Sequence, residues 1–145
     1  MDYKEKLLVG YKWYDKKKIE PLFPFGHGLS YSKFKLRRVS VTKKKHEIKI
    51  KVKLKNIGDF STFETVQCYL ERKAVKAETP KKKLIDFKKL KITKNKSKKL
   101  NLKVSKRDLS EWDVKKSKWE IAKGDYVIHI GTSVKDISIT EEIKI

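Results

Sequence analysis

The chain has 145 residues, and its 39 basic residues against 18 acidic ones give a formal net charge of +21. This length is sufficient for one domain with a core of its own. Because no run of about 18 apolar residues is present, we expect no transmembrane helix and no membrane partner. The charged N-terminus has no apolar stretch of the kind found in signal peptides, so we expect a cytoplasmic location. Cys68 is the only cysteine, which excludes an internal disulfide and a cysteine-rich zinc site.

The positive charge comes almost entirely from lysine, because arginine contributes only four of the 39 basic residues. Recognition of base edges favours the planar guanidinium of arginine over a hydrated ammonium. In the stretch HEIKIKVKLKN, lysines alternate with apolar residues, which is typical of a half-buried strand with a solvated face. We therefore predict a solvated lysine-rich surface and no specific nucleic-acid partner.

Residues 1–20 differ in character from the remainder of the chain. They combine the apolar and aromatic stretch LLVGYKWYD with a run of lysines, and Pro21 and Pro24 stiffen the backbone immediately after them. We predict an extended linker over residues 1–20, which the prolines keep from becoming helical, and a single domain over residues 21–145.

From residue 35 onward, short runs of alternating apolar and polar residues are separated by turn-forming residues. Strands are predicted at 35–42, 46–55, 65–73, 84–91, 98–104, 119–121, 126–131 and 137–145. Asn95 stands in a tight turn that can require positive φ. In SKRDLSEWD, Ser105 is expected to cap a turn of helix, with Asp108 at the N3 position. Seven or eight short strands at this spacing predict an all-β fold, an antiparallel β-sandwich.

No arrangement of residues in the sequence points to catalysis. His27, His46 and His129 are far apart, and none has a carboxylate or cysteine at metal-ligand spacing. We interpret His46 and His129 as surface or sheet histidines, and His27 as part of a turn. A glycosidase needs two carboxylates across a pocket, whereas the acids here lie mostly beside lysines on strands or in turns. The sequence therefore predicts no catalytic residue, no metal site and no cofactor.

Aromatic residues gather in the first 34 residues, mixed with leucine, valine and proline. Isolated exposed rings are typical of platforms that stack on sugars, whereas this mixture favours a protein interface. The predicted interface residues are Leu8, Val9, Trp13, Tyr14, Phe23, Phe25 and His27.

Three stretches together resemble one known protein family. VGYKWYD followed by IEPLFPFGHGLSYSKF is similar to the segment that, in family-three glycoside hydrolases (β-glucosidases and β-xylosidases), leads into a C-terminal fibronectin type III-like domain. VKLKNIGDFSTFETVQCYL resembles that domain's strand–turn–strand, with Asn56, Gly58 and Asp59 in the turn. KRDLSEWDVKKSKWEIAKGDYVIHIGTSVKDISI resembles its closing segment. The resemblance covers essentially the whole chain, although Lys18 stands where the family commonly has glycine.

The resemblance implies an immunoglobulin-like (fibronectin type III-like) sandwich without catalytic residues of its own. In the family, an N-terminal barrel holds the aspartate nucleophile and an α/β domain holds the acid/base glutamate, and neither domain is expected here. The implied function is an accessory module that braces or docks on those domains, in cis or as a separate chain, with self-association as a further outcome. The Gly26–His27–Gly28 turn would then lead the chain into the sandwich. The alternative is a stand-alone module that binds polysaccharide or an acidic polymer through its lysine-rich face.

Overall fold

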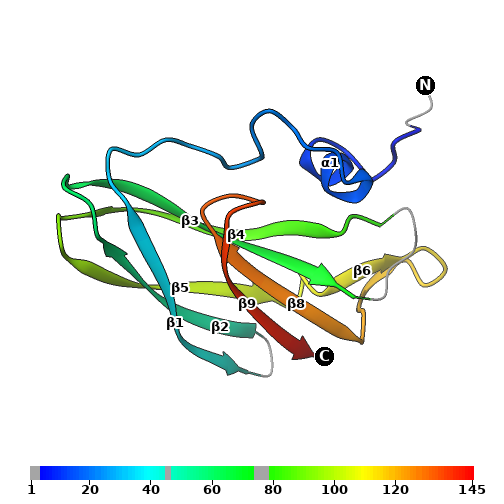
Figure 1. The fold of residues 1–145 in the computed structure, drawn as a ribbon. Coiled ribbons are helices and arrows are strands. Elements are labelled where there is room, and N and C mark those ends of the chain that lie inside the picture. Colours follow the sequence, from blue (N-terminus) through cyan, green and yellow to red (C-terminus); the bar gives the residue numbers. More distant parts are fainter. Residues whose placement is uncertain (1–3, 45–46, 74–78) are drawn as a thin grey trace.

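The computed structural model describes residues 4–44, 47–73 and 79–145. These residues form one short helix and nine strands, arranged as two packed antiparallel sheets and a separate hairpin (Figure 1). His46, the first residue of a predicted strand, lies outside the described residues. The antiparallel sandwich predicted from the strand spacing is confirmed.

The two sheets contain three and four strands. The first has the order β1-β2-β5, with β1 at Phe34–Lys43, β2 at Glu47–Asn56 and β5 at Ser97–Ser105. The second has the order β4-β3-β8-β9, with β4 at Lys82–Ile92, β3 at Thr62–Arg72, β8 at Asp125–Gly131 and β9 at Ile137–Lys144. The hairpin joins β6 (Ser110–Asp113) to β7 (Lys118–Ile121).

The core lies between the two sheets because alternate side chains of each strand point inward. On β2, every second residue from Ile48 to Leu54 is buried, while the lysines between them are wholly or partly exposed, as the alternation predicts. Val66, Cys68 and Leu70 of β3 belong to the same core from the facing sheet.

Asn56, at the end of β2, is a fully buried polar residue whose side-chain amide is satisfied four times. Its Oδ1 accepts hydrogen bonds from the Ser32 hydroxyl (2.6 Å) and the Gly58 N–H (3.0 Å). Its Nδ2 donates to the carbonyls of Phe60 (2.7 Å) and Ile92 (3.0 Å). One amide thus joins the segment before β1, the β2–β3 turn and the end of β4.

The predicted turn of helix after β5 is only partly correct. The reciprocal cap is present, because the Ser105 N–H donates to the Asp108 carboxylate (2.7 Å) and the Asp108 N–H donates to the Ser105 hydroxyl (3.2 Å). No helix comes after it within the described residues, however, because Ser110–Asp113 pair with β7 as a strand that was not predicted. Trp112 lies directly opposite Trp119 in that hairpin, and cross-strand aromatic pairs of this kind stabilise hairpins.

The prediction of an extended N-terminal linker is wrong for Tyr11–Lys17, which form helix α1. Pro21 and Pro24 do not prevent this helix, because it ends at Lys17, before the prolines begin to restrict the backbone. Lys18 ends it in the left-handed conformation, with φ of 57°. Within the described part of the chain, no helix is long and apolar enough to cross a lipid bilayer.

Candidate docking surface

Helix α1 is held against the four-stranded sheet mainly by Tyr11. The Tyr11 ring stacks on Phe25 with ring centroids 4.5 Å apart, and it meets Tyr69 of β3 edge-to-face at 6.2 Å. Its hydroxyl accepts a hydrogen bond from the Leu84 N–H at the start of β4 (2.8 Å). Burial of the phenol raises the pKa of Tyr11. One side chain therefore fixes the helix to the sandwich.

A second contact between α1 and the sheet is the ion pair of Asp15 with Lys82. The carboxylate and the ammonium are 3.5 Å apart, and the two side chains are only 10% and 11% exposed. The Lys82 ammonium also donates to the Val134 carbonyl (3.1 Å), which extends the contact to the β8–β9 loop. Shielding from water strengthens the attraction between the two charges, while their desolvation offsets part of that gain.

The turn at Pro24–Gly28 is fixed by backbone hydrogen bonds. The His27 N–H donates to the Pro24 carbonyl (2.9 Å), and the Val134 N–H donates to the Phe25 carbonyl (3.0 Å). Gly26 has a φ of 80°, which disfavours any residue with a Cβ. A Cβ there would also lie 2.2 Å from the side-chain oxygen of Gln67.

Gln67 is the buried partner that receives this turn. Its Nε2 donates to the carbonyls of Gly26 (3.2 Å) and Thr132 (2.6 Å), and its Oε1 accepts from the Tyr69 hydroxyl. The glycine–histidine–glycine turn is therefore a structural element that attaches the N-terminal segment to β3. Its docking on a neighbouring domain, which the resemblance implied, stays a prediction.

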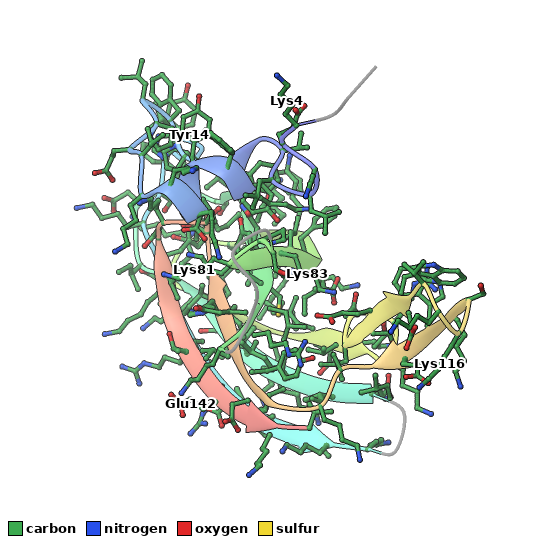
Figure 2. All side chains as sticks on the ribbon, turned by 90° about the vertical axis from the view of Figure 1, so that its right-hand side faces the viewer. Lys4, Tyr14, Lys81, Lys83, Lys116 and Glu142 are labelled. Atoms are coloured by element: carbon green, nitrogen blue, oxygen red, sulfur yellow. The ribbon has the colours of Figure 1, made fainter. Side chains whose placement is uncertain are left out.

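Most of the predicted interface residues lie on the surface of this anchored segment. Exposed side chains are those of Val9, Trp13, Tyr14, Phe23, Phe25 and His27, whereas Leu8 is half-buried. Tyr14, Phe23 and Phe25 line one hollow of about 260 Å³ between α1 and the following loop. Figure 2 shows Tyr14 on the side of α1 away from the sheets. The Phe23 ring stacks on the His27 ring at 5.7 Å. The structure does not bring Leu8, Val9 or Trp13 into that hollow.

The most exposed apolar residues of the segment were not among those predicted. Leu29 is 96% exposed, and Leu22 and Tyr31 are each 89% exposed. All three lie in the aromatic and apolar stretch of the first 34 residues, so that stretch was the available signal. We define the docking surface as the exposed apolar side chains of the segment from α1 to β1: Trp13, Tyr14, Ile19, Leu22, Phe23, Phe25, Leu29 and Tyr31.

The described residues contain no cluster of three or more histidine, cysteine or acidic side chains that could hold a metal ion. His129 contacts Glu71 on the neighbouring strand, with Nε2 and Oε2 2.7 Å apart, which is a contact within the sheet. His46 lies outside the described residues. Cys68 is buried in the core, and burial raises the pKa of its thiol.

Comparison with known proteins gives consistent matches. Residues 64–134 match the fibronectin type III-like domain family. The thermostable beta-glucosidase B of Acetivibrio thermocellus is 38% identical over 149 aligned positions, which cover 100% of this chain and 20% of that protein.

Solved structures agree with these sequence matches. The GH3 beta-glucosidase of Bifidobacterium adolescentis superimposes with a TM-score of 0.94 and 30% identity, over 99% of this chain and 22% of that one. The beta-glucosidase of Kluyveromyces marxianus in complex with glucose gives a TM-score of 0.92 and 34% identity, over 99% of this chain and 18% of that one. The chain thus spans about a fifth of the length of the proteins it matches. This chain is therefore a fibronectin type III-like domain that matches the C-terminal region of GH3 β-glucosidases over essentially its whole length.

Proposed function

We propose that this chain is a non-catalytic accessory module of a β-glucosidase-type glycoside hydrolase, which docks through its docking surface on the catalytic barrel and α/β domains. The proposal rests on two observations about the segment from α1 to β1: its apolar side chains are exposed, and its backbone is attached to the sheets. Leu22, Leu29 and Tyr31 are almost fully exposed, yet the segment that carries them is attached to the sheets at both Tyr11 and Gly26. Many exposed apolar side chains on one short, fixed segment are typical of an interface.

The energetics favour a protein partner for this surface. Burying one large apolar side chain stabilises a complex by about 1.5–3 kcal/mol. Because the backbone is already ordered, little conformational entropy is lost when a partner covers it. Figure 1 shows the segment from α1 to β1 passing across the β3–β4 side of the sandwich, so a partner would contact this side. The matched regions of the relatives lie within much longer enzymes, which agrees with a partner in cis.

The test is binding to a catalytic part that lacks its own matching region. We would produce beta-glucosidase B of Acetivibrio thermocellus without that region and measure association by calorimetry, with the enzyme's own matching region as the positive control. The double variant Leu29→Ser, Tyr31→Ser should weaken binding by at least about tenfold. Val39→Ser, which removes an exposed apolar side chain from β1 of the three-stranded sheet, is the control and should have no effect. If the positive control binds and this chain does not, the docking proposal is wrong.

A second candidate function, binding of an acidic polymer, is favoured by the strand register of the three-stranded sheet. Arg37, Lys53 and Lys99 lie side by side on β1, β2 and β5. Like charges directly opposite each other destabilise a sheet. None of these three side chains forms a salt bridge within the described residues. A polyanion lying across the strands would relieve this repulsion.

This candidate is tested by calorimetry with dextran sulfate, with neutral dextran as the control ligand. Lys53→Gln combined with Lys99→Gln should weaken binding, whereas Lys115→Gln combined with Lys118→Gln, which removes the same charge from the hairpin, should not. Binding that vanishes by about 150 mM salt, or that both double variants weaken equally, would reflect net charge alone and exclude this candidate.

A further inference from the structure

A cavity of about 480 Å³ opens between the β6–β7 hairpin, the N-terminal segment and the adjoining ends of β3 and β4. It is separate from the hollow of the docking surface and shares no lining residue with it. Three buried residues, Leu70, Leu109 and Tyr126, contribute apolar surface to its lining. A cavity of this size is within the range of small-molecule sites.

The hairpin supplies an indole ring that a ligand can reach. Trp112 and Trp119 both line the cavity, and their rings meet edge-to-face with centroids 5.5 Å apart. The guanidinium of Arg107 covers one face of Trp119, 3.3 Å from the ring centroid. Trp112 is about half exposed and has no cation over it within the described residues. We therefore assign Trp112 as the stacking surface.

The cavity also carries positive charge that the described residues do not neutralise. Lys12, Lys81 and Lys83 line it, and none of them forms a salt bridge within the described part of the chain. The Lys83 ammonium donates to the backbone carbonyl of Asp108. Burial lowers the pKa of Lys83, while the nearby charges of Asp108 and Glu111 act in the opposite direction. An ammonium has three donors, so Lys83 retains donors for an acceptor from outside. Figure 2 shows Lys83 on β4, beside the β6–β7 hairpin.

The two carboxylates of the lining are already engaged by other groups. The Asp108 carboxylate accepts from both the N–H (2.7 Å) and the hydroxyl (2.6 Å) of Ser105. The Glu111 carboxylate pairs with the Arg72 guanidinium at 2.8 Å. Neither is within salt-bridge distance of Lys83. The cavity thus offers cations to an incoming anion.

We propose that this cavity binds a ring-shaped organic carboxylate, with its carboxylate on Lys83 and the flat face of its ring against Trp112. The apolar lining and the indole favour a ring, and a half-buried ammonium without a carboxylate partner favours an anion. A uronic acid residue and a benzoic acid share this chemistry. The site is independent of the docking surface, so either proposal can fail without the other.

The experiment uses the full chain and NMR titration with matched ligand pairs. Glucuronate is compared with glucose, and benzoate with benzyl alcohol, each at up to about 10 mM, since millimolar affinity is expected for so small a ligand. We expect the indole N–H signal of Trp112 to shift with an acid and not with its neutral partner. A response to glucuronate alone identifies a sugar acid as the ligand, and a response to benzoate alone identifies an aromatic acid. No response to either acid, or an equal response to the neutral partners, overturns the proposal.

Two lysine variants test whether the binding is local. Lys83→Met should weaken binding of the acid at least about tenfold, because it removes the charge and keeps the length of the side chain. Lys91→Met removes an equal charge from β4, outside the cavity, and should leave the affinity unchanged. Equal losses in both variants would mean that net charge attracts the acid, and the proposal would be wrong. Chemical shifts of the wild-type chain locate the site even if Lys83→Met is unstable.

Discussion

Deleting residues 1–20 should lower the stability of the domain without unfolding it. The deletion removes the half-buried ring of Tyr11, its contacts with Phe25 and Tyr69, and the Asp15–Lys82 pair. Helix α1 itself contributes no buried residue. Partial burial of one ring, two aromatic contacts, one hydrogen bond and one shielded ion pair together amount to about 3–5 kcal/mol. A domain of this length has a free energy of unfolding of roughly 7–20 kcal/mol, so the sandwich should remain folded.

Thermal unfolding by circular dichroism is the assay. The truncated chain should unfold cooperatively with a Tm about 10–15 °C below that of the full chain. Tyr11→Phe, which removes only the hydrogen bond to Leu84, should cost about 1 kcal/mol and therefore a few degrees. If truncation leaves the chain unfolded at 25 °C, the segment is part of the core, and its exposed residues cannot be assigned to docking. Association with the catalytic part, measured on the same protein, should weaken but persist, because Leu22, Leu29 and Tyr31 remain.

The fold and the proposed function support three more predictions. Asn56→Ala should destabilise the domain by about 3–5 kcal/mol in urea unfolding, because it leaves buried carbonyls and an N–H unsatisfied, whereas Asn101→Ala on the outer face of β5 should be nearly neutral. The purified chain should not hydrolyse an aryl β-glucoside, and turnover that a single carboxylate substitution abolishes would contradict the accessory function. Its retention on DNA should be weak and should disappear near about 150 mM salt, and nanomolar affinity for one sequence there would contradict this.

The sheets could be predicted because their signal is local. On β2, the alternation of lysine with isoleucine, valine and leucine fixes which face is buried, whatever the rest of the chain does. The tight turn predicted at Asn95 is also confirmed, since Asn95 has a φ of 60°. By contrast, β6 was missed because Ser110–Asp113 is too short to show a strand period. The pairing of Trp112 with Trp119 forms only when the turn between them brings β6 and β7 together.

Helix α1 could not be predicted from the same rules, because its seven residues carry little periodicity. A helix this short is stabilised mainly by its contacts with the rest of the fold. Tyr11 and Asp15 are four residues apart and lie on one face of the helix, and both contact the sheet. The spacing of Tyr11 and Asp15 is visible in the sequence. It can be interpreted only once the structure shows that their partners are Leu84 and Lys82 on β4. Lys18 stands where the family commonly has glycine, and in this chain it adopts the left-handed conformation that ends the helix.

For the docking surface too, the composition of the sequence indicated an interface, but only the structure shows which side chains face solvent. The cluster of aromatic residues near the N-terminus predicted an interface, yet the cluster has two separate roles in the structure. Tyr11 faces inward and holds the segment on the sandwich, while Leu29 and Tyr31 face solvent. Phe25 does both, since it stacks on Tyr11 and remains partly exposed. Substitutions of Tyr11 should therefore act through stability, and substitutions of Leu29 should act through association alone, so the two roles can be separated by experiment.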